Sequence, residues 1–515
     1  MTPSQRIALN TIATYTRSVF SAALGLFSMR WVLGALGQSD FGLFSVVGSI
    51  ITFIVFLNGI MAGSAARHFA YSIGEGDADK VNQWFNAAFS IHLILPIILI
   101  FVGWPIGEYC IAHVLTIPLD RIATSLWVFR ISLLSAFFSM VTIPFSAMFT
   151  AKQHITTLAV WGTLQSVLSF IFAFLLTRMS GDRLLLYAIG IVTITIFMQV
   201  GLSVQAIIVF RECRIRRAQW FDLERFKQIF SFAGWSFIGV FGTILRNQGS
   251  PLLLNIFFGP KVNAAFGIAN TITAQAMTLS SAMTGAFSPE ITVSEGRGER
   301  NKMLEIALRM CKFSTLLVML LAIPLIVEVD YVLKLWLHDV PPYAGTLCQL
   351  MLIMFLIDQL TVGYMSAVNA QGKIAAYQAT LGTILVLTLP LAWLFLKVGY
   401  PPTGVGFAFI INIFLVSLGR VFWGRHLLGM RVQKWLTQVV IPCTAVGVIS
   451  TLAALTPLWW LSSSFTRFFL VTVASAIATI LAGWFIALNA SERSFFAKNT
   501  ANMKKHFWLR YAKPA

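Results

Sequence analysis

The sequence predicts an all-α integral membrane protein with about fourteen transmembrane helices. Three features support this prediction: an apolar composition, long apolar segments that recur along the chain, and basic residues concentrated in alternate loops. Of the 515 residues, 57% are hydrophobic and 11% are charged, whereas a soluble domain carries about 25% charged residues. Because so few charged residues cannot cover a surface that faces water, most of the surface is expected to face lipid.

Apolar segments long enough to span a bilayer recur throughout the chain. A transmembrane helix needs about 20 mostly apolar residues. The predicted segments lie near 9–34, 41–70, 84–108, 122–149, 154–178, 184–210, 230–258, 263–289, 304–328, 343–370, 374–397, 402–424, 436–460 and 466–489. The connections between them are short, so any activity is expected to reside in the helices rather than in a soluble domain.

The distribution of basic residues predicts the orientation of the chain. The formal net charge is +18, and with the N-terminus inside, the inner loops hold several times more Lys and Arg than the outer loops. Cytoplasmic loops carry such an excess, so both termini are predicted to be cytoplasmic, and nucleic acid is not expected as a partner. The basic stretch 211–217 and the C-terminal tail could also bind anionic lipid headgroups, although a plain topological signal is the simpler interpretation.

The two halves of the chain resemble each other. A shift of 222 residues places Gly37 on Gly259, and it overlays SIGEGDADK (72–80) on SEGRGERNK (294–302). Six predicted helices separate equivalent points, and an even number preserves orientation, so parallel repeats about an axis along the membrane normal are expected. The predicted organisation is a six-helix bundle at 1–210, a basic cytoplasmic linker at 211–229, a second six-helix bundle at 230–430, two additional helices at 431–490 and a basic tail at 491–515.

Three stretches carry a resemblance to a known family: RWVLGALGQSDFGLFSVVGSI (30–50), the loop 72–80 and SAMFTAKQH (146–154). With the duplication and the two extra helices, the chain resembles the polysaccharide and lipid-linked oligosaccharide flippases of the MOP superfamily, of the O-antigen flippase type. That superfamily also holds the MATE drug exporters and the lipid II flippases.

The resemblance implies a MATE-like fold and a location in the bacterial inner membrane. It implies that the protein moves an undecaprenyl-pyrophosphate-linked oligosaccharide, a repeat unit of O-antigen, capsule or exopolysaccharide, from the cytoplasmic to the periplasmic leaflet. Alternating access of two lobes, coupled to protons or sodium, would drive this movement. The implied partners are the lipid-linked oligosaccharide, membrane lipids and other proteins of polysaccharide assembly.

Arginines within the predicted helices are candidate ligands for a pyrophosphate. Arg17, Arg30, Arg130 and Arg246 fall in apolar segments, where a charged group is costly unless it faces water or a partner. A guanidinium group binds phosphate oxygens in pairs and keeps its proton. Arg17 and Arg246 lie more than one helical turn from their segment ends, so they are the stronger candidates. The alternative is that these side chains are structural ties or extend to the membrane surface.

Two further polar residues are candidates for other roles. Asp358 is the one acid placed near a helix middle, so it is either an ion-coupling site for protons or sodium, or the salt-bridge partner of an arginine. Gln275 lies between Thr271 and Thr278 on a polar stripe that could contact sugar hydroxyls. The same stripe could equally hold helices together.

The residues disfavour two other function classes. A MATE-type exporter of cationic compounds would favour acidic residues in its helices, and this chain places arginines there. A membrane enzyme of polysaccharide assembly is disfavoured because the loops are short and contain no catalytic cluster; the DxD spacing of Asp77 and Asp79 is taken as chance. The five cysteines are scattered and contain no CxxC, so neither a metal nor another cofactor is expected.

Overall fold

The structure is a computed structural model of the chain. It describes residues 3–494 except 75, 153, 217, 218, 338, 373 and 491. It describes the backbone but not the side chains of residues 3–19, 22, 56–64, 66, 67, 70, 71, 74, 228, 230–240, 279, 282, 285, 286, 289, 292, 293 and 296. The predicted tail at 491–515 lies outside the described residues, apart from 492–494.

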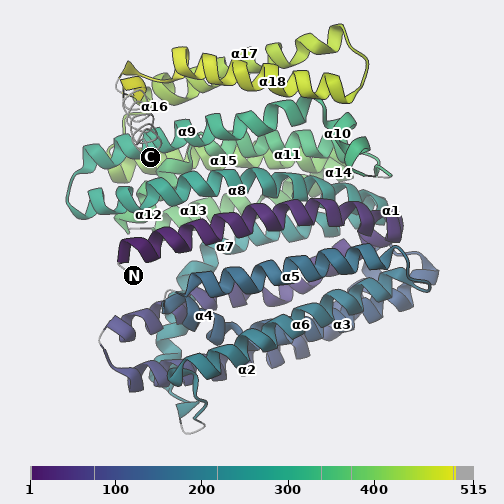
Figure 1. The fold of residues 1–515 in the computed structure, drawn as a ribbon, viewed down its shortest axis with the longest axis vertical. Helices are drawn as coiled ribbons and strands as arrows, with labels where there is room; N and C mark the ends of the chain where they lie inside the picture. Colours follow the sequence, from purple (N-terminus) through teal and green to yellow (C-terminus); the bar gives the residue numbers. More distant parts are fainter. Residues whose placement is uncertain are drawn as a thin grey trace, which may run out of the picture. The chain divides into compact units, whose positions relative to one another are not determined.

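The described chain is built of helices and contains no strand, which confirms the predicted all-α class (Figure 1). The α-helices are α1 (Pro3–Gly74), α2 (Ala78–Tyr109), α3 (Ile122–Val141), α4 (Ile143–Ala151), α5 (Ile155–Leu176), α6 (Arg183–Val209), α7 (Leu223–Phe258), α8 (Pro260–Gly296), α9 (Arg300–Val327), α10 (Val329–Trp336), α11 (Ala344–Gln359), α12 (Val362–Gln371), α13 (Ala375–Val386), α14 (Thr388–Lys397), α15 (Thr403–Leu428), α16 (Val432–Trp435), α17 (Ile441–Leu455) and α18 (Phe465–Ala482). Three π-helical turns, η1 (Cys110–Val114), η5 (Leu436–Val440) and η7 (Gly483–Ala487), extend these helices.

Many of these helices are long and apolar enough to span a membrane. Within the described residues there are 10 such spans, or up to 11 if α11 and α12, which meet at an angle of 47°, are counted as one broken span. One of the 10 is part of α1, which is two helices joined at a kink at Gly37. The protein is therefore a multi-pass membrane protein, and the count of fourteen remains a prediction.

Aspartates begin several helices. The side chain of Asp77 accepts a hydrogen bond from the backbone N–H of Lys80 at the start of α2, and Asp182 and Asp222 cap α6 and α7 in the same way. Such caps satisfy backbone donors that have no partner inside the helix. Asp77, the first acid of the DxD spacing, thus caps a helix.

The chain forms two compact units. The first comprises Met1–Gln275, Leu333–Met351 and Ala375–Asn412, and the second comprises Ala276–Val332, Leu352–Ile374 and Ile413–Ala515. Four of their boundaries fall inside helices, namely α8, α10, α11 and α15. The predicted division into lobes at 211–229 remains a prediction.

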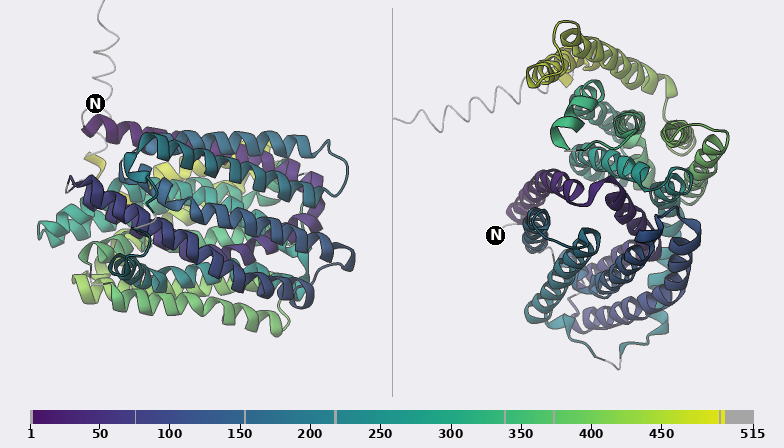
Figure 2. Two further views of the ribbon diagram at one scale, coloured as in Figure 1. Left: turned by 90° about the horizontal axis from the view of Figure 1, so that it is seen from below. Right: turned by 90° about the vertical axis from the view of Figure 1, so that its right-hand side faces the viewer.

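Each unit has its own packing. In the first, the beginning of α2 packs edge-to-face on α4, with ring centroids 5.2 Å apart for Phe85 and Phe145. Phe149 of α4 packs on Phe210, with ring centroids 4.9 Å apart. In the second, α17 and α18 lie side by side and pack on α9 (Figures 1 and 2).

Glycines at equivalent places in the two halves share an unusual backbone conformation. Gly37 (φ 76°, ψ 171°) and Gly259 (φ 78°, ψ −174°) lie 222 residues apart. Gly76 and Gly298, separated by the same interval, have φ values of 78° and 75°. The described backbone thus supports the internal repeat seen in the sequence, because glycine recurs where only glycine adopts these angles without strain.

Replacing Gly37 with alanine is expected to destabilise the protein. An alanine at this φ and ψ costs about 1–3 kcal/mol, so the midpoint of thermal unfolding of the purified protein should fall. Gly34→Ala is the matched control, because Gly34 lies in the regular part of α1 and an added methyl group would meet nothing within 4 Å. Equal unfolding midpoints for the two variants would show that the backbone angles at Gly37 do not require glycine at this position.

Candidate functional site

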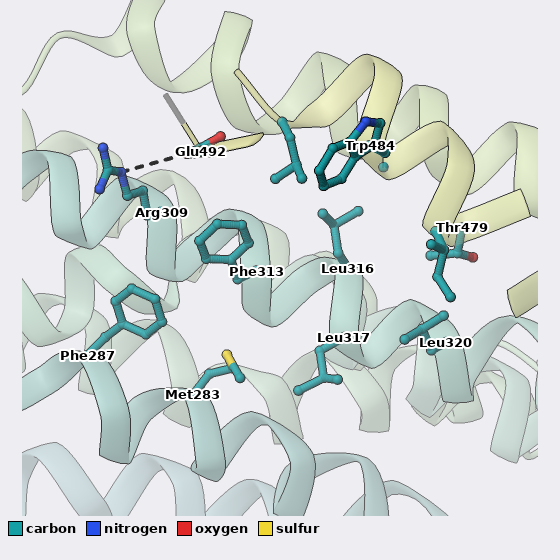
Figure 3. Close-up of a pocket in the computed structure, with 13 residues that line it drawn as sticks. Met283, Phe287, Arg309, Phe313, Leu316, Leu317, Leu320, Thr479, Trp484 and Glu492 are labelled. Atoms are coloured by element: carbon teal, nitrogen blue, oxygen red, sulfur yellow. Dashed lines mark ion pairs between the residues drawn. The ribbon is translucent and has the colours of Figure 1, made fainter. Parts of the chain in front are cut away.

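An apolar cavity of about 790 Å³ lies within the second unit (Figure 3). Its walls come from α8, α9 and the end of α18 with its π-helical turn η7. The lining residues are Met283, Phe287, Arg309, Phe313, Leu316, Leu317, Leu320, Thr479, Ile480, Gly483, Trp484, Leu488 and Glu492. Its size is typical of ligand pockets, which measure about 300–1,000 Å³.

The apolar wall follows from the sequence of α9. Phe313, Leu316, Leu317 and Leu320 recur at intervals of three, four and seven residues, which places them on one face of a helix. Trp484 faces them from η7 (Figure 3). The hydroxyl of Thr479, the polar residue on this wall, is already used, because it donates to the Ser475 carbonyl and Ser450 Oγ. The middle of the cavity therefore offers contacts for hydrocarbon.

Charged groups close one end of the cavity. Lys312 Nζ lies 2.8 Å from Glu492 Oε2, and both side chains are almost completely buried, at 1% and 2% exposure. Arg309 Nε lies 3.8 Å from the other carboxylate oxygen, and its side chain is 42% exposed. Two cations share one carboxylate, so this cluster carries a net charge of +1, and Arg309 is its accessible member.

A short turn after α18 positions Glu492. The backbone N–H of Asn489 donates to Glu492 Oε2, and the N–H of Glu492 donates to Asn489 Oδ1, both at 3.0 Å. This reciprocal pair is a capping box. These hydrogen bonds therefore orient the Glu492 carboxylate toward Lys312.

A second polar cluster surrounds the break between α11 and α12. Arg420 Nη1 of α15 lies 2.8 Å from Asp358 Oδ1 and donates to Thr361 Oγ1 at 3.2 Å. The indole N–H of Trp435 donates to the Leu360 carbonyl at 2.8 Å. A broken helix within a membrane requires such partners, because its freed backbone groups have no water to bind.

The predicted arginines have different surroundings. The backbone of Arg17 is part of α1, but its side chain lies outside the described residues. Arg30 is exposed on α1. Arg130 Nε pairs with Glu108 Oε1 at 2.7 Å, and its guanidinium lies 5.2 Å from the ring centroid of Trp127. The partner of Arg130 is thus an acid of α2 near the helix end.

The other predicted residues lie on α7, α8 and α11. Arg246 donates to Asn247 Oδ1 at 3.0 Å, and its guanidinium lies 5.4 Å from the ring centroid of Phe409. Gln275 is half-buried on α8. Asp358 forms an ion pair with Arg420. It is thus the salt-bridge partner of an arginine, one of the two alternatives that the sequence left open. Its role in ion coupling remains a prediction.

The sequence analysis did not single out Arg420 or the pair formed by Lys312 and Glu492. Arg420 was detectable in principle, because it lies inside the apolar segment 402–424. Lys312 follows Arg309 by three residues and so shares its helix face. Glu492 could not be assigned, because nothing in the tail sequence shows that this acid returns to α9. Among the described residues no group of His, Cys, Asp and Glu could hold a metal ion.

Glu492→Gln is expected to destabilise the protein strongly. Removing one member of a buried ion pair leaves the other charge uncompensated and costs about 3–5 kcal/mol. The double variant Lys312→Met/Glu492→Met should recover most of the thermal stability of the purified protein.

The control for this prediction is Glu305→Gln. It breaks the exposed pair between Lys434 Nζ and Glu305 Oε1, 3.4 Å apart, and should change stability by less than about 1 kcal/mol. If Glu492→Gln unfolds at the same temperature as Glu305→Gln, the buried pair contributes no more to the stability of the protein than a surface pair does.

Comparison with known proteins identifies the family. Residues 7–293, more than half of the chain, match the family described as "Polysaccharide biosynthesis protein". No curated protein matches the sequence significantly.

Solved structures share the fold. An inward-facing multidrug resistance MATE family transporter of the MOP superfamily aligns with a TM-score of 0.69 and 15% identity, over 79% of this chain and 94% of the transporter. The lipid II flippase MurJ in an inward closed conformation aligns with a TM-score of 0.64 and 13% identity, over 92% of this chain and 98% of MurJ. A MOP superfamily transporter from Pyrococcus furiosus aligns with a TM-score of 0.60 and 16% identity, over 83% of this chain and 96% of that protein. The chain therefore belongs to the polysaccharide biosynthesis protein family and has the fold of the MOP superfamily.

Proposed function

We propose that the protein is a flippase that moves an undecaprenyl-pyrophosphate-linked oligosaccharide from the cytoplasmic to the periplasmic leaflet of the bacterial inner membrane, and that it is not an enzyme. The family match and the shared fold support a transporter. The observation that carries the proposed substrate is the apolar cavity with a cationic end.

The cavity suits two of the three parts of such a substrate. The polyprenyl tail is hydrocarbon and matches the wall formed by Phe313, Leu317 and Trp484. The pyrophosphate is anionic and matches the net positive charge around Arg309, whose planar guanidinium binds phosphate oxygens in pairs. The glycan is polar and would travel in a water-filled space elsewhere between the helices.

The break between α11 and α12 is the proposed coupling site. Discontinuous transmembrane helices mark ion and substrate sites in transporters. Binding a proton or a sodium ion at the Asp358 carboxylate would weaken its pair with Arg420. Loss of this ion pair would loosen the contact between α11 and α15. The contact would then have a paired and an unpaired state, and alternating access could use these two states.

The alternative function is a coupled exporter of small molecules. A cationic drug would require an acidic lining, whereas the one carboxylate at the cavity, Glu492, is already shared by Arg309 and Lys312. The charge of the cavity therefore favours an anionic substrate.

Arg309→Ala is expected to reduce surface glycan at least tenfold in a strain that depends on this protein, since a hydrogen bond to a charged group contributes about 1.5–3 kcal/mol. Arg309→Lys should retain part of the activity, because it keeps the charge and loses the paired geometry. Arg425→Ala, which removes an exposed arginine from the last turn of α15, is the control at matched expression. Full glycan export by Arg309→Ala would exclude phosphate binding at this cavity.

Asp358→Asn is expected to uncouple transport from the ion gradient. In proteoliposomes loaded with a fluorescent lipid-linked oligosaccharide, the wild type should respond to an imposed proton or sodium gradient, and the variant should not. Glu305→Gln serves as the control for loss of an acidic group. If the variant still responds as the wild type does, Asp358 is only a structural partner of Arg420.

A further inference from the structure

The first part of the linker (residues 211–229) is tied to the first turns of α2 by buried amides. Asn82 Nδ2 donates to the carbonyls of Glu212 and Arg214, both at 2.8 Å, and Asn86 Nδ2 donates to the Arg214 carbonyl at 3.0 Å. The N–H of Arg216 in turn donates to Asn86 Oδ1 at 2.6 Å. Asn82 and Asn86 are 3% and 0% exposed. The linker backbone is thus held against α2.

Side chains reinforce this attachment. Lys152 Nζ lies 2.6 Å from Glu212 Oε1, and Ser90 Oγ donates to the Trp220 carbonyl at 2.6 Å. The Trp220 ring packs edge-to-face on Phe89 at 5.8 Å. Burial raises the pKa of Glu212, but the hydrogen bond and charge of Lys152, a backbone hydrogen bond and the charge of Arg211 together outweigh burial and hold that pKa below its usual range. Glu212 therefore remains ionised and paired at neutral pH.

Three basic side chains in the first part of the linker, those of Arg211, Arg214 and Arg216, are exposed, whereas Arg225 packs on the Trp84 ring of α2. Arg211 and Arg214 are exposed and form no ion pair within the described part of the chain. The Arg216 side chain is 50% exposed, and its guanidinium lies 3.6 Å from Asp79 Oδ1, whose side chain is 81% exposed. Such an exposed pair contributes little to stability. The linker thus presents three cations on a fixed backbone.

Large apolar side chains are exposed beside these cations. Phe221 is 77% exposed, Leu223 is 86% exposed and Ile215 is 46% exposed. Exposed aromatic and aliphatic side chains among arginines are typical of elements that lie at the boundary between lipid headgroups and acyl chains.

The place of the linker in the chain matches that boundary. The last turn of α6 exposes Ile208 at 78% and Val209 at 49%, as expected of a surface that faces lipid tails. Arg211 follows two residues later, so the exposed surface changes there from apolar to cationic. The headgroup region of a bilayer begins at such a change.

We propose that the linker is a binding site for anionic phospholipids, in which Arg211, Arg214 and Arg216 bind headgroup phosphates while Phe221 and Leu223 insert among the upper acyl carbons. This inference goes beyond the proposed function, because it concerns bulk membrane lipid and not the transported substrate. The buried amides of α2 keep the three cations outward and on one surface.

Native mass spectrometry of the purified full-length protein tests the proposal. It measures the binding of phosphatidylglycerol and of phosphatidylcholine. The wild type should prefer phosphatidylglycerol, and the variant Arg211→Gln/Arg214→Gln/Arg216→Gln should lose about fivefold in affinity for each charge removed. Affinity for phosphatidylcholine should not change. Undiminished binding of phosphatidylglycerol to the triple variant would overturn the proposal.

A charge-matched control separates this site from net charge. Arg178→Gln/Lys261→Gln/Lys397→Gln removes three exposed cations from other parts of the same unit and should keep the preference for phosphatidylglycerol. An equal loss in this control would show that net charge alone attracts the lipid.

A probe at Phe221 locates the linker directly. A bimane on Phe221→Cys, in a chain whose partly exposed Cys110 is replaced by Ser, should be quenched by doxyl-labelled lipids in phosphatidylglycerol vesicles and protected from iodide. Quenching by iodide alone would place the linker in water and overturn the proposal. Neither readout depends on glycan export, so failure here leaves the proposed function standing.

Discussion

The structure depends on one constraint: a charge or free backbone group within hydrocarbon must find its partner inside the protein. In the second unit, Glu328 and Arg467 illustrate it. Glu328 is 1% exposed, and its two oxygens lie 2.6 and 2.8 Å from nitrogens of Arg467. The pairs of Asp358 with Arg420 and of Lys312 with Glu492 obey the same constraint. Because the two partners of each pair lie far apart in the sequence, these pairs also specify which segments pack together.

The proposed function depends on a positive charge that this pairing does not neutralise. The cluster at the end of the apolar cavity has two cations for one carboxylate, and Arg309 remains partly exposed. An anion that enters the cavity would complete this pairing, while the wall formed by Phe313 and Trp484 accommodates hydrocarbon. The combination suits a molecule with a long apolar tail and a phosphate head, which is the chemistry of a lipid-linked saccharide.

The linker illustrates the same constraint outside the hydrocarbon, at the proposed level of the lipid headgroups. Its backbone groups find partners in Asn82 and Asn86, which are buried, so its arginines need not fold inward. Side chains that leave the hydrocarbon can remain unpaired with protein, since water and phosphate groups are available there. The same rule that pairs Asp358 therefore leaves Arg211 and Arg214 open.

Local patterns in the sequence determined the helices, the class of membrane protein and the repeat. Long apolar segments have no other stable form in a bilayer, and Gly37 and Gly259 recur because their backbone angles exclude side chains. The apolar face of α9 could also be read from its spacing. The partners of the charged residues could not, because Asp358 meets Arg420 across 62 residues and Lys312 meets Glu492 across 180. The packing of distant helices decides which charges neutralise one another and which stay available for a ligand. The spacing of charges along the sequence does not predict this packing.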